Sequence, residues 1–290
     1  KDRVGFDENI IPGPGLTPIH STETFDATTP RAVLTWYPSD AVTVYASYAE
    51  GFRSGADQPG AIQRGRPDFP AAEPDKLHNY EIGAKADVLD HQLSFDAAVY
   101  YMDWDDVQQS VNVPLGVSFF ATLVNTESAS GIGADFAATM RLLEGLEFGM
   151  SVSWNDLEVD DDVISQNVPL YHKGDRLNAS PEWTAGASLD YVFALGSGGL
   201  RGRLGAAGNY TSEQDLRTTF RGVTGVGKGD PILLTRASFA IESDNRWTVT
   251  LFGENLNDER GAVTAQGNGV AAWTVRVRPR TIGVQLDYAF

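Results

Sequence analysis

Side chains along nearly the whole chain alternate between apolar and small or polar residues, and helical spacing is almost absent. In "LEFGMSVSW", for example, Leu146, Phe148 and Met150 alternate with Glu147 and Gly149. Successive side chains of a β-strand point to opposite faces, so this period of two predicts two-faced strands. The pattern predicts an all-β, antiparallel fold of about eleven strands, which start near Arg31, Val42, Leu77, Leu93, Ala129, Leu146, Pro181, Leu200, Pro231, Arg246 and Pro279.

The connections between these strands alternate strictly between short and long. Tight turns rich in Gly, Asn, Asp or Pro are expected at residues 38–41, 90–92, 143–145, 195–199 and 243–245. Long connections separate them at residues 51–75, 105–128, 159–180, 212–230 and 257–278. In an up-and-down sheet this places every long loop at one end. That asymmetry is typical of a transmembrane β-barrel of the outer membrane.

The two faces of the predicted strands support the same interpretation. Small residues and aromatics share the apolar face, and the aromatics expected there gather near strand ends, as in an interfacial girdle: Trp36, Tyr101, Trp104, Trp154, Trp183, Tyr191, Phe193, Trp247 and Tyr288. The other face carries charges that suit a wet lumen, and the residues predicted to face it are Asp96, Asp135, Arg141, Glu147, Arg201 and Arg203. A soluble propeller or solenoid of hairpins is the alternative, but no blade-length repeat is visible.

Composition excludes several classes of partner. The 290 residues include 39 Asp and Glu but only 22 Lys and Arg, which gives a net charge of −17. No basic surface is therefore available to bind nucleic acid. There is no cysteine, and no apolar run reaches the roughly 18 to 20 residues of a membrane helix. The most apolar stretch, Val117 to Val124, is far too short.

An odd number of antiparallel strands cannot close neatly into a bacterial barrel. Left open in lipid, each unpaired backbone group at the two edges would cost several kcal/mol. The chain is therefore expected to form part of a larger barrel and to be open when alone. Residues 1–29 are expected to form an extracellular loop segment and residues 30–290 the C-terminal part of the barrel.

Four passages resemble one protein family, in its order and spacing. They are "YASYAEGFRSG" from Tyr45, "NYEIGAKADVLDHQLSFDAAVYYMDWDDVQ" from Asn79, "GENLND" from Gly253 and "PRTIGVQLDYAF" from Pro279. The sequence resembles TonB-dependent outer-membrane receptors. The resemblance implies a 22-stranded barrel around a plug, of which this chain is the C-terminal half. The plug, the TonB-binding box and the first barrel half have no counterpart in these residues.

The last predicted strand ends on an aromatic residue, although chain termini are usually polar and frayed. Val284, Leu286, Tyr288 and Phe290 alternate with small or polar residues. This ending resembles the signal that the barrel-assembly machinery reads in outer-membrane proteins. An ordinary edge strand that ends on Phe by chance is the alternative.

Motifs of catalysis and metal binding are not found. No pair among His20, His78, His91 and His172 has the spacing of a zinc site, and neither a nucleophile elbow nor a phosphate-binding loop is present. No catalytic residue, metal or cofactor is expected. The acidic stretches at residues 103–106 and 158–162 are expected to be solvated loops, with calcium binding as the alternative.

Candidate ligand contacts lie in the predicted long loops. Phe52 and Arg53 follow a strand directly, and an arginine fork pairs well with carboxylates, although Arg53 could equally anchor its loop. Tyr171 and Trp273 are further loop-borne candidates.

By resemblance, the intact protein is a receptor of the bacterial outer membrane that takes up a scarce nutrient such as a ferric siderophore. Its expected partners are outer-membrane lipid, a small-molecule iron chelate, the barrel-assembly machinery and, through the plug, TonB. Two other functions remain open: a self-contained passive porin-like barrel, and an outer-membrane hydrolase whose site is assembled across strands.

Overall fold

The computed structural model of the chain describes residues 2–7, 20–58, 70–115, 118–165, 168–196, 198–220, 223–244, 246–265 and 274–289. Every regular element in these ranges is a β-strand. Among the described residues there is no helix long and apolar enough to cross a membrane.

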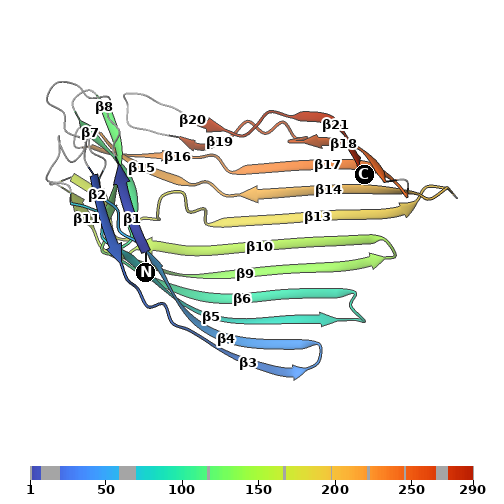
Figure 1. The fold of residues 1–290 in the computed structure, drawn as a ribbon, viewed down its shortest axis with the longest axis horizontal. Helices are drawn as coiled ribbons and strands as arrows, with labels where there is room; N and C mark the ends of the chain where they lie inside the picture. Colours follow the sequence, from blue (N-terminus) through green and yellow to red (C-terminus); the bar gives the residue numbers. More distant parts are fainter. Residues whose placement is uncertain are drawn as a thin grey trace.

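Eleven of the described strands form one antiparallel sheet, and each pairs with its neighbours in chain order (Figure 1). Their bounds are β3 Arg31–Ser39, β4 Val42–Arg53, β5 Asp75–Val88, β6 Leu93–Asp105, β9 Ser128–Leu143, β10 Leu146–Val159, β13 Trp183–Ala194, β14 Leu200–Thr211, β17 Ile232–Ser243, β18 Trp247–Glu254 and β21 Thr281–Tyr288. Each begins within two residues of its predicted start. The all-β, antiparallel, up-and-down arrangement predicted from alternation is confirmed, and the sheet stays open.

Short and long connections lie at opposite ends of this sheet, as predicted (Figure 1). One end carries the turns after β3, β5, β9, β13 and β17, and it is called the turn end below. The connections after β4, β6, β10, β14 and β18 lie at the other end, the loop end. Gly145, at φ +77°, completes the two-residue turn between β9 and β10, where only glycine avoids the cost of a left-handed backbone.

The turn between β5 and β6 is built differently. Leu89, Asp90 and His91 all have positive φ, between 53° and 63°, which is rare for residues with a Cβ. Asp87 holds the turn, because its carboxylate contacts His91 Nδ1 at 2.6 Å and accepts a hydrogen bond from Ser94 Oγ at 3.3 Å. Side-chain bonds thus offset the cost of the left-handed backbone.

The long connections contain hairpins that alternation did not predict. Four lie in described residues of these connections, and a fifth precedes β3: β7 (Gln108–Leu115) with β8 (Ser118–Asn125), β11 (Val163–Ser165) with β12 (Val168–Tyr171), β15 (Asp215–Phe220) with β16 (Val223–Lys228), β19 (Ala262–Ala265) with β20 (Thr274–Arg276) and, before β3, β1 (Asp2–Asp7) with β2 (His20–Phe25). Residues 1–29, expected to be a loop throughout, therefore contain a paired hairpin. The strands β7, β12, β15, β16 and β19 contact one another at the loop end.

The apolar face of the sheet is not covered by other described parts of the chain. Register places Leu34 on β3, Ile82 on β5 and Val99 on β6 on one face of the sheet, and their exposed fractions are 76%, 60% and 58%. Soluble proteins rarely expose an apolar patch this large, whereas a sheet that contacts lipid must do so. The sealed interior of a soluble sandwich is absent from the described sheet.

Aromatic residues border this apolar face, as predicted. Near the loop end, the ring centroids of Tyr48 and Tyr80 lie 5.0 Å apart, and those of Tyr80 and Tyr101 lie 6.3 Å apart. At the turn end, Tyr191 and Phe193 stack at 5.1 Å. The prediction for Trp104 was wrong: this residue pairs with Leu77 and lies on the other face, because it is three positions from Tyr101 in a regular strand.

Candidate functional site

The polar face of the sheet carries all six residues predicted to face a lumen. The register of the sheet places them on this face. Ala98, two residues from Asp96, pairs with Asp135, and Arg141 pairs with Glu147. Glu147 also pairs with Asp190, whose strand β13 pairs with β14, the strand of Arg201 and Arg203. In a closed barrel this face would line the interior, but the role of these six residues there stays a prediction.

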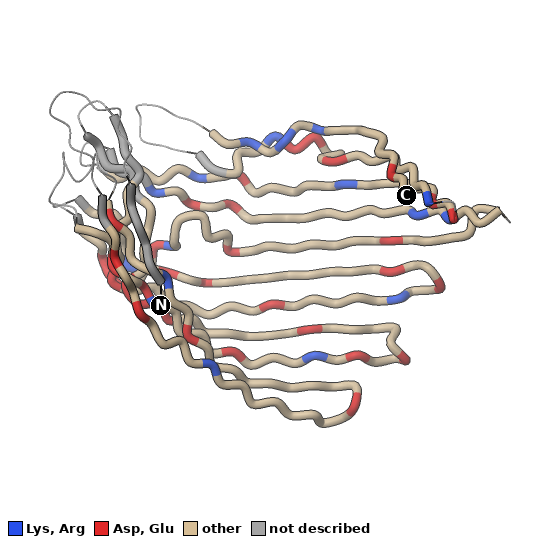
Figure 2. Tube along the Cα trace, in the orientation of Figure 1, with Lys and Arg blue, Asp and Glu red and all other residues tan. Residues whose placement is uncertain are grey.

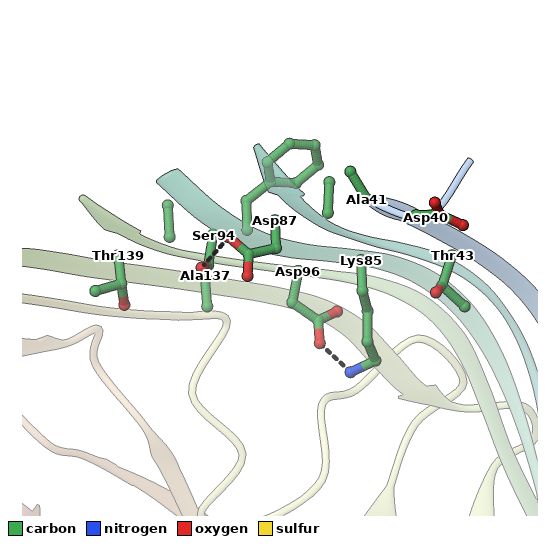
Figure 3. A pocket seen from close by; sticks show the side chains of 12 residues that line it. Asp40, Ala41, Thr43, Lys85, Asp87, Ser94, Asp96, Ala137 and Thr139 are labelled. Atoms are coloured by element: carbon green, nitrogen blue, oxygen red, sulfur yellow. Dashed lines mark hydrogen bonds and ion pairs between the residues drawn. The ribbon is translucent and has the colours of Figure 1, made fainter. Parts of the chain in front are cut away.

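Ion pairs on the polar face are local and exposed. Lys85 on β5 pairs with Asp96 on β6, as Figure 3 shows. Arg203 Nε donates to Glu242 Oε1 at 3.1 Å, while Arg141 lies 3.9 Å from Glu147. Exposed pairs of this kind contribute at most about 1 kcal/mol each. These pairs determine the pattern of charge on the polar face, and they add little to the stability of the sheet.

Hollows lie along the same face. One of about 380 Å³ lies over β4, β5, β6 and β9 and is lined by Thr43, Lys85, Asp96 and Thr139 (Figure 3). Another, of about 760 Å³ at the turn end, is lined by Arg141, Glu147, Asp190 and Arg203. These side chains stand in a row along the sheet, so the face resembles a wall more than an enclosed catalytic site.

Two tyrosines on the polar face lie across glycines of the next strand, which sequence reasoning did not single out. The ring of Tyr45 covers Gly83, where a Cβ atom would collide with it, and Tyr100 covers Gly133 in the same way. The Tyr45 hydroxyl donates to Glu81 Oε1 at 2.6 Å. A glycine on the polar face beside an aromatic of the preceding strand is the signal that could have found these contacts.

The most thoroughly buried residues of the described chain lie at the loop end. They form an apolar core beneath the hairpins, called the loop cluster below: Val107, Ala129, Leu157, Val159, Val163, Leu170, Tyr171 and Leu177, with Met102, Trp104 and Val124 packed against it. Its members come from the long connections after β6 and after β10 and from the adjoining ends of β6, β9 and β10. The loop cluster therefore holds two long loops together as one unit.

Tyr171, a predicted ligand contact, lies inside this core. Its side chain is 1% exposed, and its hydroxyl donates to Gln109 Oε1 at 3.1 Å. The guanidinium carbon of Arg217 stands 5.3 Å from the ring centroid. Burial raises the pKa of Tyr171 above its usual value, and the nearby charge of Arg217 opposes this. In this structure the side chain of Tyr171 is buried, and its role as a ligand contact stays a prediction.

Arg217 joins the long loop after β14 to the long loop after β10, and sequence reasoning missed it. The buried side chain contacts Asp175 Oδ1 at 2.8 Å and donates to the Arg176 carbonyl at 2.7 Å, and its backbone N–H donates to Asn178 Oδ1 at 2.8 Å. Nearby, Lys228 Nζ donates to Glu213 at 3.1 Å, and this bond, assisted by Asp215, raises the pKa of Lys228. Nothing in the local sequence of Arg217 distinguishes it from a solvated loop arginine.

Arg53, another predicted ligand contact, anchors its loop. Its guanidinium pairs in a fork with Asp75, which is 1% exposed, and lies 4.7 Å from the centroid of the Trp104 ring. The backbone N–H of Gln108 donates to the same carboxylate at 3.1 Å. Of the two roles that the sequence left open for Arg53, the contacts favour the anchor. Phe52 lies on the opposite, apolar face.

The other predicted residues are less informative. Trp273 and Phe290 lie outside the described residues. Val284, Leu286 and Tyr288 lie on the apolar face of β21, where their side chains are 60% to 71% exposed. Their role as an assembly signal stays a prediction.

The acidic stretch at residues 158–162 has partners within the protein. Asp160 accepts hydrogen bonds from Ser128 and Ser130, at 2.9 and 2.7 Å, and Asp162 accepts one from the backbone of Lys173 at 2.8 Å. In the described part of the chain, no group of three or more His, Asp or Glu side chains could hold a metal ion. Asp160 therefore contacts side chains of β9, whereas Asp162 holds the backbone of its own loop.

Comparison with solved structures finds the same architecture in iron receptors. The ferric yersiniabactin uptake receptor FyuA from Yersinia pestis is 20% identical, with a TM-score of 0.70 over 94% of this chain and 39% of its own. The siderophore receptor PiuA from Acinetobacter baumannii is 15% identical, with a TM-score of 0.66 over 95% and 38%. The ferric enterobactin receptor PfeA from Pseudomonas aeruginosa, solved as a mutant with enterobactin, is 17% identical, with a TM-score of 0.62 over 93% and 41%.

At these identities the structural matches establish the fold alone, and the chain spans about two-fifths of the proteins that it matches. No curated protein matches the chain in sequence. Residues 5–256 match the family described as TonB dependent receptor-like, beta-barrel. Because this match covers most of the chain, and because the open sheet and its two faces agree with it, the chain belongs to the β-barrel family of TonB-dependent receptors.

Proposed function

We propose that these residues form the wall and part of the mouth of an active outer-membrane transporter, which takes up an iron chelate such as a ferric siderophore. The observation that carries the proposal is the division of the sheet into two faces. Large apolar side chains stay exposed on one face of ten of the eleven strands, while the other face carries the six predicted lumen charges and the hollows. Lipid suits the first face and a water-filled, plugged lumen suits the second.

The open sheet supports a partnership with strands outside this chain. Within the described residues, β3 and β21 each have only one neighbour, and all nine residues of β3 are exposed. Because unpaired backbone groups are costly in lipid, both edges must pair with further strands of the intact receptor. In this arrangement the loop end is extracellular, the turn end is periplasmic, and TonB acts through a plug inside the completed barrel.

Uptake of radioactive iron by cells tests this function. A strain that lacks the gene is complemented with the intact receptor and supplied with ferric chelates under iron limitation. We expect uptake that stops when a protonophore collapses the proton gradient or when TonB is deleted. Uptake that survives both treatments would instead indicate a passive pore, and restored growth without iron uptake would indicate a different cargo.

A further inference from the structure

A separate hollow on the polar face lies at the loop end of β14, β17 and β18, where the chain enters β21. Its volume is about 280 Å³, and its lining includes Asn209, Leu234, Arg236, Glu254, Asn255 and Arg278. It shares none of these residues with the loop cluster. It is smaller than a typical ligand pocket of about 300 to 1,000 Å³, which fits one wall of a site completed by other parts of the receptor.

Both arginines of this hollow are available to a ligand. Arg236 stands on the polar face of β17, where Ala207 and Glu254 are its neighbours in register. Neither Arg236 nor Arg278 has a side-chain hydrogen bond or ion pair with any residue that the structure describes. The other arginines of the basic stretch at β20 and β21 (Figure 2) do have contacts: Arg276 donates to the Arg260 carbonyl, and Arg280 lies 3.8 Å from Asp258.

The backbone that carries Arg278 is held in place. Asn255 is 6% exposed and has a φ of +50°, and its amide donates to the carbonyls of Glu259 and Arg278 at 2.9 and 2.8 Å. The backbone N–H of Glu259 returns a bond of 2.7 Å to the Asn255 side chain. A guanidinium that is presented from a fixed backbone loses less entropy when it binds a ligand.

We propose that Arg236 and Arg278 bind anionic oxygens of the cargo. The hollow has a net positive charge in a chain whose net charge is −17, and arginine forks match carboxylate and phenolate oxygens. Glu254, in the same hollow, can accept hydrogen bonds from N–H groups of the same ligand. This inference rests on the proposed function and narrows the cargo to an anionic chelate with hydrogen-bond donors.

Binding of two iron(III) chelates of different charge to the intact receptor in outer membranes tests the inference. The probes are an iron(III) tris-catecholate, which is anionic, and an iron(III) tris-hydroxamate, which is neutral. Arg236→Gln and Arg278→Gln are each expected to weaken binding of the catecholate about 10- to 100-fold and to leave the hydroxamate unchanged. Arg236→Lys, which keeps the charge but not the fork, should restore binding in part.

Arg260→Gln is the matched control, because Arg260 lies at the same end, is 79% exposed and pairs with Asp258. The heat-dependent gel mobility of every variant checks that the barrel has folded. Equal losses for both chelates, or no loss for the catecholate, would overturn the role of the arginines. A receptor that binds the neutral chelate alone, or neither chelate, would refute this inference, while the uptake assay decides the transport proposal separately.

Discussion

The sheet and the loop cluster follow opposite packing rules within one chain. On the sheet, large side chains such as Leu34 and Val284 are 76% and 70% exposed, because no described residue covers the apolar face. In the loop cluster, Val107 and Tyr171 are 0% and 1% exposed and pack against other loops. The sheet needs lipid as its apolar partner, whereas the loop cluster buries its apolar groups as a soluble domain does. Substitutions should therefore have different effects in the two regions.

The largest effect is expected inside the loop cluster. Leu157→Ala removes a side chain that is 6% exposed and leaves a cavity, so the loop cluster should lose about 2 to 5 kcal/mol of local stability. Hydrogen exchange of the intact receptor in detergent measures this as faster exchange in β7, β12 and β15, with the sheet unchanged. Leu204→Ala is the matched control, because Leu204 is 46% exposed on the apolar face. Equal effects of the two substitutions would remove the distinction between the regions.

A charge on the apolar face should have the next largest effect. Leu251 lies near the middle of β18, is 52% exposed and pairs with Phe239 and Val284. Leu251→Arg places a guanidinium in lipid and should cost about 2 to 4 kcal/mol near the bilayer midplane. Urea titration of the receptor folded in lipid vesicles, followed by gel mobility, gives this difference.

The control for this substitution is the adjacent residue on the other face. Thr250 lies next to Leu251 in sequence and lines a hollow of about 390 Å³ on the polar face. Thr250→Arg should cost much less than Leu251→Arg, because water reaches that face. If Thr250→Arg is the more damaging substitution, the assignment of lipid and lumen to the two faces is reversed.

The strands could be predicted from the sequence, whereas the core of the loop cluster could not. A period of two is local, so each strand of the sheet was recognisable without knowledge of its neighbours. The contact of Tyr171 with Gln109 joins residues 62 positions apart, and the contacts of Arg217 join β15 to residues 175–178. Such partners depend on how the loops fold over one another, which alternation does not encode. The misplaced Trp104 is different, since strict counting along its own strand would have put it on the polar face.

Tyr171→Phe tests the difference between the buried loop cluster and the exposed sheet, and it has the smallest expected change in stability. The substitution removes one hydrogen bond to Gln109 inside the loop cluster, which is worth about 0.5 to 1.5 kcal/mol. It also removes the pH dependence of loop-cluster stability that comes from ionisation of the Tyr171 phenol. Because burial raises the pKa of Tyr171 in the folded state, the phenol stabilises the loop cluster fully below the pKa of an unfolded tyrosine, about 10, and this contribution is lost as pH rises through the raised value.

Proteolysis of the loops in the intact receptor at increasing pH measures this contribution. Wild-type loops should become more sensitive above about pH 10, and Tyr171→Phe should flatten that rise while making the loops slightly more sensitive at neutral pH. Tyr210→Phe is the control, since Tyr210 is 38% exposed on the apolar face. If Tyr171→Phe leaves proteolysis unchanged at every pH but abolishes binding of the chelate, Tyr171 contacts the ligand directly. The loops must then open during binding, because only an open loop cluster exposes that side chain.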